Sequence, residues 1–235
     1  MGTSTSYTAP TGGGWPSAKR QATRFARTAG AAGGQVSPIQ VIAAYIRAHG
    51  GADSAASSAV AAQGAIQRLG SFISQFVRGG LAEALASVGL AHLVGRDAGV
   101  VLEELVDWLA GPSGTLDESI AHTAMLTLLA RELPSLDVLA DLDVAGVERM
   151  LGTLLIEYVY QRMVVELGVH LQNGALTAAE AVRAERDLYS YIIADVEFEF
   201  QFVGVNSVVW AGPEGQEIVK RLLESAYAQL AAVTV

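Results

Sequence analysis

Residues 144–173 read VAGVERMLGTLLIEYVYQRMVVELGVHLQN and form the longest periodic stretch of the chain. Apolar side chains recur along it at steps of three, four and seven residues, the spacing that places them on one face of an α-helix. Asn173-Gly174 is a typical helix stop, because both residues tolerate the left-handed backbone that closes a helix. We therefore predict one long helix here and an all-α body around it. The stripe comprises Val147, Leu151, Leu154, Tyr158, Val165 and Val169.

The flanking sequence predicts further helices, each with its own start and stop signals. Ser37-Pro38 reads as an N-cap followed by proline at the first helical position, which favours a helix from Pro38 to His49. Two Thr-x-x-Glu capping boxes start others, because hydroxyl and carboxylate satisfy the free amides of a first turn. The boxes are Thr115/Glu118 and Thr177/Glu180, and the predicted helices span 38–49, 53–80, 81–88, 97–110, 115–134 and 144–173, with two more after Thr177 and Gly212-Pro213.

One segment has a conflicting pattern. Residues 196–203 read VEFEFQFV and alternate apolar and polar residues, which in isolation is typical of a β-strand. No partner strand is evident, and the helix predicted before this segment has no stop signal. We therefore favour a helix over residues 196–203 and an irregular multi-helix bundle as the fold.

The composition excludes several classes of protein. The chain has 235 residues, of which 51% are hydrophobic and 17% charged, and its net charge is −9. No window offers the ~20 nearly uncharged residues of a membrane-spanning helix. The absence of cysteine excludes disulfides, thiolate metal sites and a cysteine nucleophile. A nucleic-acid binder has a basic footprint, which this acidic chain lacks, so we expect no direct contact with nucleic acid. We also expect a cytoplasmic protein that has no membrane contact and no cofactor.

The charge is unevenly distributed. Residues 1–35 hold four basic residues and no acid, a net +4, whereas residues 36–235 hold 11 basic and 24 acidic residues, a net −13. The first 16 residues are mostly Gly, Ser, Thr and Pro, and bury too little apolar area to offset their ordering entropy. We expect a flexible basic tail over 1–35, with at most a short helix after Ser17, and an all-α body over 36–235. The loop at 134–143 either divides this body into two subdomains or is an ordinary connection.

The common catalytic motifs are absent, since the chain has no GxGxxG after a strand, GxxxxGK[ST], GxSxG or HExxH. Two Glu-x-x-x-His pairs, Glu118/His122 and Glu166/His170, each place a carboxylate and an imidazole on one helix face. On facing helices such pairs could hold a metal, which gives a metal-dependent helical-bundle enzyme as an alternative function. We favour solvated surface pairs, because di-iron bundles use Glu-x-x-His spacing and further Glu ligands.

The extreme N-terminus carries a more specific feature. A small residue at position 2 lets the initiator Met1 be removed, which exposes the α-amine of Gly2. With a pKa of about 7.7–8.0, this amine is substantially nucleophilic near neutral pH. The sequence MGTSTS also fits the N-myristoylation pattern, so a lipidated or peripheral scaffold protein is a further alternative. An ordinary disordered terminus is the simplest interpretation of the residues alone.

The first 30 residues resemble a known family. The opening Met1-Gly-Thr-Ser-Thr-Ser-Tyr7, the Gly/Pro-rich spacer with Trp15-Pro16, the basic segment from Lys19 to Arg27 and the Ala-rich helical body are similar to the B component, QatB, of Qat bacterial anti-phage defence operons. Those operons also encode an ATPase, a QueC-like enzyme and a TatD-like nuclease. The resemblance implies a non-enzymatic partner of the QueC-like protein, and the operon's ATPase is a second candidate partner.

The resemblance also implies a chemistry for the tail. QueC enzymes activate a carboxylated 7-deazapurine with ATP, and a relative in a defence operon could transfer the activated carboxylate to a protein amine. The α-amine of Gly2 would be the acceptor and its neighbours would enter the enzyme's channel. The residues implied to contact the partner are Thr3, Ser4, Tyr7, Trp15, Lys19, Arg20, Arg24 and Arg27.

Overall fold

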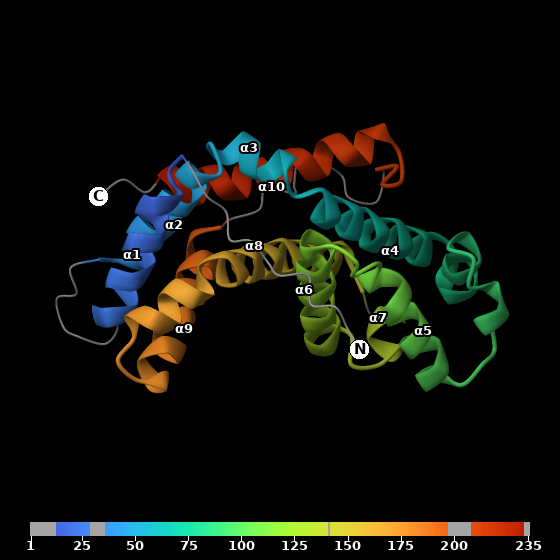
Figure 1. Cartoon of the computed structure of the whole chain (residues 1–235). Helices are drawn as coiled ribbons and strands as arrows, with labels where there is room; N and C mark the ends of the chain where they lie inside the picture. The colour runs from blue at the N-terminus through green and yellow to red at the C-terminus, as the bar shows by residue number, and fades with distance from the viewer. Residues whose placement is uncertain (1–12, 29–35, 141, 197–207, 233–235) are drawn as a thin grey trace. The chain divides into compact units, whose positions relative to one another are not determined.

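The computed structural model describes residues 13–28, 36–140, 142–196 and 208–232. All regular structure within these ranges is helical and none of it is β-strand, which confirms the predicted all-α fold (Figure 1). The helices are α1 Trp15–Thr28, α2 Pro38–Ala48, α3 Ala52–Ser57, α4 Val60–Ser87, the 3₁₀ helix η1 Ala91–Leu93, α5 Ala98–Ala110, α6 Leu116–Glu132, α7 Asp137–Ala140, α8 Val144–Gly174, α9 Ala178–Asp195 and α10 Pro213–Ala232.

The predicted helix starts are confirmed by their caps. In α6, the Thr115 hydroxyl accepts from the Glu118 N–H at 3.2 Å, and a Glu118 carboxylate oxygen accepts from the Thr115 N–H at 2.7 Å. The same reciprocal pair starts α9, and the Asp97 carboxylate accepts from the Gly99 N–H at 2.9 Å at the start of α5. These bonds satisfy first-turn amides that lack a helical partner.

Three elements differ from the prediction. The predicted helices over 53–80 and 81–88 have a break after Ser57 and then continue as α4 through a kink at Gly80, whose φ of 75° suits glycine. The short helix α7 forms inside the 134–143 loop. The 196–203 segment lies outside the described residues except for Val196, where α9 has ended in extended backbone.

The backbone packing divides the chain into two units. Unit 1 consists of the described residues within Met1–Ala55, Arg162–Val196 and Glu224–Val235. Unit 2 consists of the described residues within Ala56–Gln161 and Glu197–Leu223. Three of the four boundaries therefore fall within α3, α8 and α10, and the fourth follows α9 at Val196. The 134–143 loop lies inside unit 2.

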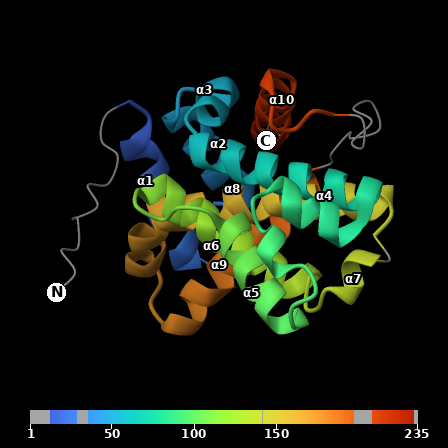
Figure 2. The same cartoon turned by 90° about the vertical axis from the view of Figure 1, so that its right-hand side faces the viewer.

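In unit 1, α1 packs on α2 and α9, and α2 packs on α9 (Figure 1). In unit 2, α4 packs on α5, α6 and η1, and α5 packs on α6, as Figure 2 shows for the teal and green helices. Apolar faces at helical spacing form both cores, which follows the amphipathic pattern of the sequence. Fully buried side chains include Val41, Ile42, Ile46, Leu188 and Ile192 in unit 1, and Leu69, Ile73, Leu105, Leu109, Met125 and Leu128 in unit 2.

The apolar stripe of α8 is confirmed in its first half only. The four stripe residues from Val147 to Tyr158 are buried, whereas Val165 and Val169 are exposed. After Arg162 the buried apolar side chains of α8 are Met163, Leu167 and Leu171. Residues up to 161 pack in unit 2 and the later ones in unit 1, so the helix buries different faces along its length.

Gly70 provides a test of the packing in unit 2. A Cβ atom at Gly70 would lie 2.4 Å from the indole of Trp210, which is buried. We expect Gly70→Ala to lower the free energy of unfolding by about 1–3 kcal/mol in urea titrations, because the ring must move. Gly64→Ala is the control in the same helix, since its Cβ would meet only the Arg68 guanidinium, at 3.5 Å. That substitution should stabilise by about 0.5–1 kcal/mol, and equal stabilities of the two variants would contradict the close contact.

Candidate functional site

Helix α1 is fixed to unit 1 along one apolar face. The face contains Trp15, Ala18, Ala22, Phe25 and Ala26, all of them buried. Its alanines let the helix approach α2 and α9 closely, because a methyl group adds little thickness to the helix. The short helix predicted after Ser17 is therefore present and begins two residues earlier, at Trp15.

Two glycines allow the backbone to approach even more closely. A Cβ atom at Gly174, at the end of α8, would lie 2.3 Å from the Thr23 carbonyl oxygen of α1. A Cβ atom at Gly14 would lie 3.0 Å from the Cα of Ala48 in α2. Residues 13–28 are thus a packed part of unit 1, whereas the flexibility predicted for residues 1–12 and 29–35 concerns residues outside the described ranges.

The opposite face of α1 is basic. Arg20, Arg24 and Arg27 are exposed and lie at steps of four and three residues, so they share one face. Among the described residues, none of these three guanidinium groups has a carboxylate within ion-pair distance. Lys19 is half-buried beside His170, whose pKa is lowered first by burial and then by the lysine charge. The face defined by Arg20, Arg24 and Arg27 is called the α1 basic face below.

Trp15 is the aromatic anchor of α1. Its indole meets the Tyr45 ring edge-to-face at a centroid distance of 5.8 Å and the His49 ring at 5.0 Å. Tyr45 and His49 contact each other at 4.7 Å. Trp15 itself is only 7% exposed. We therefore assign Trp15 to the anchoring of α1 in unit 1. The direct contact with a partner that the resemblance implies stays a prediction.

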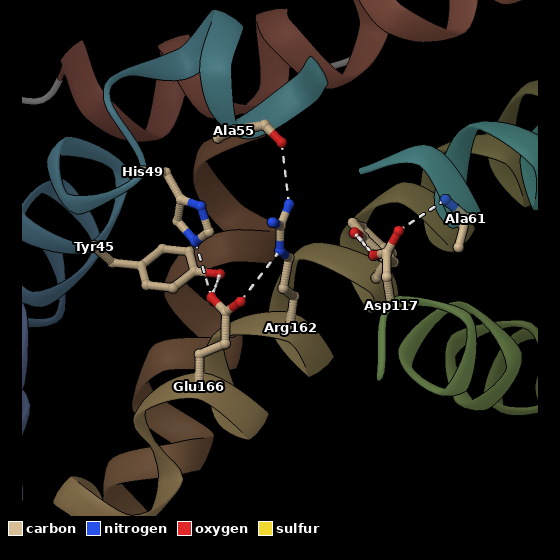
Figure 3. A network of polar contacts seen from close by, with 8 residues as sticks. Tyr45, His49, Ala55, Ala61, Asp117, Arg162 and Glu166 are labelled. Atoms are coloured by element: carbon tan, nitrogen blue, oxygen red, sulfur yellow. Dashed lines mark hydrogen bonds and ion pairs between the residues drawn. The ribbon is translucent and has the colours of Figure 1, made fainter. Parts of the chain in front are cut away.

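Behind this anchor lies a buried polar network centred on Glu166 (Figure 3). One carboxylate oxygen of Glu166 accepts from the Tyr45 hydroxyl at 2.7 Å and lies 2.8 Å from Nε2 of His49. The other lies 3.6 Å from Nε of Arg162, whose Nη1 donates to the Ala55 carbonyl at 3.0 Å. The side chains of Glu166 and Arg162 are each 8% exposed. The network therefore joins α2, α3 and α8 through groups that water does not reach freely.

The network changes the pKa values of its members. Burial by itself raises the pKa of Glu166, but the hydrogen bonds from His49 and Tyr45 and the charge of Arg162 outweigh it and hold the pKa below its usual value. Burial and the neighbouring Glu166 carboxylate raise the pKa of Tyr45 well above 10.0. At neutral pH Glu166 is therefore ionised and Tyr45 is a neutral hydrogen-bond donor.

Unit 2 contains a second polar cluster, centred on Asp117 of α6 (Figure 3). One oxygen of Asp117 accepts from the Ala61 N–H at 2.8 Å, and the other accepts from the Tyr158 hydroxyl at 2.5 Å. Because the N-cap residue of α4, Ala59, has no side-chain acceptor, Asp117 caps this helix from another element. This role is structural, since it satisfies an otherwise free first-turn amide.

The two Glu/His pairs do not form a common site in the described residues. Glu118 is occupied in the cap of α6, and Nδ1 of His122 lies 3.1 Å from the Gly111 carbonyl oxygen, both in unit 2. Glu166 binds Tyr45, His49 and Arg162 in unit 1, where His170 lies beside Lys19. The described ranges contain no group of three His, Asp or Glu side chains with the arrangement of a metal site.

The predicted site residues nearest the N-terminus lie outside the described ranges. They are Gly2, Thr3, Ser4 and Tyr7. The feature that sequence reasoning missed is the Glu166 network, because its partners are separated by more than 100 residues. The sequence offers one signal for this network: Arg162 and Glu166 of α8 are ionisable residues inside an apolar helix pattern.

None of the helices in the described ranges has the length and apolar character needed to span a bilayer. A family model described as "Qat anti-phage system associated protein QatB" matches residues 50–230 of the chain. Neither a curated protein nor a solved structure matches the chain significantly. The matched range contains α8, with Arg162 and Glu166, and begins after α1 and α2.

Proposed function

The chain belongs to the QatB family of Qat anti-phage system associated proteins, and from this premise we propose that it presents its own N-terminus to a partner enzyme. As a family member it is a component of an anti-phage defence system. In the proposed function it acts as substrate and adaptor and does no catalysis. The partner is a QueC-like enzyme, and the acceptor is the α-amine of Gly2 after removal of Met1.

The observation that carries the proposal is the anchoring of α1. Trp15 packs on Tyr45 and His49, so the helix that follows the N-terminal segment is held in a fixed place on unit 1. The 13 residues from Gly2 to Gly14 can extend at most about 45 Å from this anchor. A terminus attached in this way is confined near a docked enzyme, which raises its effective concentration at the active site.

The transfer proceeds by acyl substitution. ATP converts the carboxylate of the 7-deazapurine to an acyl adenylate with release of pyrophosphate. The neutral amine of Gly2 then attacks the acyl carbon, an amide bond forms, AMP leaves, and one proton from the amine passes to solvent or to a base of the enzyme. A pKa of about 7.7–8.0 leaves a useful fraction of this amine unprotonated near neutral pH, unlike a lysine amine.

The α1 basic face determines which charge the partner's docking surface must carry. Three exposed guanidinium groups lie on one side of the anchored helix, while residues 36–235 carry a net −13. A cationic patch on an acidic protein attracts an acidic surface and speeds encounter with it at low ionic strength. The proposed partner surface is therefore acidic and lies near the entrance to the enzyme's active site.

Intact mass spectrometry of the chain co-expressed with its operon neighbours tests the proposal. We expect one adduct, which peptide mapping confines to the N-terminal peptide and which matches the 7-deazapurine acyl group. Gly2→Leu should abolish it, because a large second residue retains Met1, whereas Gly2→Ala should keep it. An unmodified terminus in the wild-type chain would overturn the proposal, and a mass gain matching a 14-carbon acyl chain would favour a lipidated scaffold instead.

A charge-reversal arm of the same experiment tests the docking surface. Glutamate at all three positions of the α1 basic face should slow adduct formation about tenfold or more at low salt, because attraction becomes repulsion. The matched control reverses the exposed Arg183 and Arg186 of α9, which lie in the same unit. Equal slowing by both variants would show that net charge matters and the α1 basic face does not.

A further inference from the structure

The second half of α8 and the helix α9 present apolar side chains to solvent in unit 1. Along α8, Val165, Val169 and Leu176 are exposed at steps of four and seven residues, which places them on one side of the helix. Along α9, Val182 and Ile193 are also exposed and lie three helical turns apart, so they share one side as well. The stripe that predicted burial for Val165 and Val169 therefore faces solvent. These five side chains define the α8–α9 face.

A pocket of about 470 Å³ lies where the end of α8 meets the start of α9. All of its described lining residues belong to unit 1, and they include Leu176 and Val182 of the α8–α9 face. Three others are alanines, Ala175, Ala178 and Ala181, whose small side chains leave room beside the leucine. Leu176 is 77% exposed and therefore protrudes at the edge of the pocket. The surface thus carries a knob and a hole next to each other.

The size of the α8–α9 face suits a weak interface. Eleven residues of α8, from Val165 to Leu176, extend about 16 Å, and two adjacent helices are about 20 Å wide. Exposed apolar patches of a few hundred Å² on a folded chain commonly mark interaction sites. A stable complex usually buries about 800 Å² on each partner, more than this face offers by itself. We therefore expect association through it to be reversible and micromolar.

The two units differ in charge, which limits where a second copy of the chain can approach. The described ranges of unit 1 hold 8 basic and 7 acidic residues, a net +1, whereas those of unit 2 hold 7 basic and 14 acidic residues, a net −7. Two copies of this acidic chain repel each other where both present unit 2. Two copies of unit 1 meet without that repulsion, and the α8–α9 face lies on unit 1.

Glu185 and Arg186 make this region complementary to itself in charge. Glu185 lines the pocket, and the exposed Arg186 follows Val182 by one helical turn. Neither side chain forms an ion pair within the described ranges of the chain. In a two-fold symmetric contact, Glu185 of each copy can pair with Arg186 of the other, so two ion pairs form at once. A purely acidic or purely basic partner would leave one of the two charges without a counter-charge.

We propose that the α8–α9 face binds the same face of a second copy of this chain, in a symmetric dimer. Leu176 of each copy enters the alanine-lined pocket of the other, and the exposed valines pack around this contact. Glu185 and Arg186 pair across the two-fold axis at its edge. An apolar centre with a charged rim is the usual anatomy of a protein interface. The dimer goes beyond the proposed function, since it uses neither Gly2 nor the partner enzyme.

Sedimentation equilibrium of the full-length chain from about 1 to 500 μM tests the dimer. We expect a monomer–dimer equilibrium with a Kd on the order of 10–100 μM. Leu176→Glu should raise this Kd at least about tenfold, because the interface would bury an unpaired carboxylate. Its Tm should equal that of the wild type, since Leu176 is exposed in the single chain. The matched control is Val60→Glu, which adds the same charge at an exposed valine of unit 2 and should associate like the wild type.

A charge exchange tests the two-fold symmetry. Glu185→Arg alone and Arg186→Glu alone should each weaken self-association about fivefold or more, because like charges then meet across the axis. An equimolar mixture of the two variants should recover association as a heterodimer, since every arginine again meets a glutamate. The double variant that carries both exchanges should also associate like the wild type. Only a contact between the same faces of two copies predicts both recoveries.

Three results would each overturn the dimer: a monomer at every concentration, a Leu176→Glu variant that associates like the wild type, and a mixture of the two charge variants that stays monomeric. A monomeric wild type whose Leu176→Glu variant loses the adduct would assign the face to the partner enzyme instead. A monomeric wild type that dimerises after deletion of residues 1–12 would assign it to that segment. Gly2→Leu should dimerise like the wild type, so the dimer and the proposed function fail independently.

Discussion

Glu166→Gln is expected to lower the free energy of unfolding by about 3–5 kcal/mol, because it leaves the buried Arg162 without its carboxylate. The amide oxygen of glutamine can still accept from Tyr45 or His49, but it carries no charge, and its NH₂ group repels their donors. Since Glu166 and Arg162 are each 8% exposed, water can replace the lost interaction only in part. Urea denaturation monitored by circular dichroism measures the loss.

The same substitution should change the pH dependence of stability. The pKa of Glu166 in the folded chain lies below its ordinary value of 4.5, so its contribution is complete above pH 4.5 and is lost as the pH falls through the lower folded value. The wild-type chain should therefore lose stability in acid more steeply than Glu166→Gln. The control is Glu104→Gln, which breaks the exposed pair with His92 and should cost less than about 1 kcal/mol. Parallel acid profiles for Glu166→Gln and the wild type would contradict an ionised Glu166.

Trp15→Ala is expected to release α1 from unit 1. Removing a buried tryptophan side chain costs about 3–5 kcal/mol, and here it also removes both edge-to-face contacts with Tyr45 and His49. Because α1 contacts unit 1 along a single apolar face, part of this cost should appear as local unfolding. Amide hydrogens of residues 18–28 should exchange about 100-fold faster, as measured by hydrogen exchange with mass spectrometry.

The variant also tests the proposed function. If the anchored helix confines the N-terminus near the enzyme, Trp15→Ala should slow adduct formation at Gly2, although Gly2 itself is unchanged. Trp15→Phe keeps an aromatic ring against Tyr45 and should have a smaller effect on both measurements. Trp108→Ala removes a half-buried tryptophan of unit 2 and should leave α1 exchange unchanged. If the amide hydrogens of α1 exchanged at the wild-type rate in Trp15→Ala, the rest of its apolar face would be enough to hold the helix.

The candidate site was only partly predictable, and its residues show why. The apolar side of α1, with Ala22, Phe25 and Ala26, follows from spacing, and so does the position of the α1 basic face. The burial of Trp15 does not follow, because the residue sits after a glycine run and beside Pro16, in a segment that reads as a linker. The sequence pattern pairs Glu166 with His170, four residues away on the same helix. In the structure its carboxylate instead binds Tyr45 and His49, which come from another part of the chain.

The sequence by itself determined most of the helices, because their start and stop signals are local. Caps such as Thr115/Glu118 and the three- and four-residue apolar spacing act between residues within one or two turns, so they operate wherever the segment lies. Only the tertiary structure decided which face of α8 is buried after Arg162, where Trp15 packs, and which groups neutralise Glu166. Those outcomes depend on the packing of segments more than 100 residues apart, as Tyr45 and Glu166 are, and no local pattern specifies such pairings.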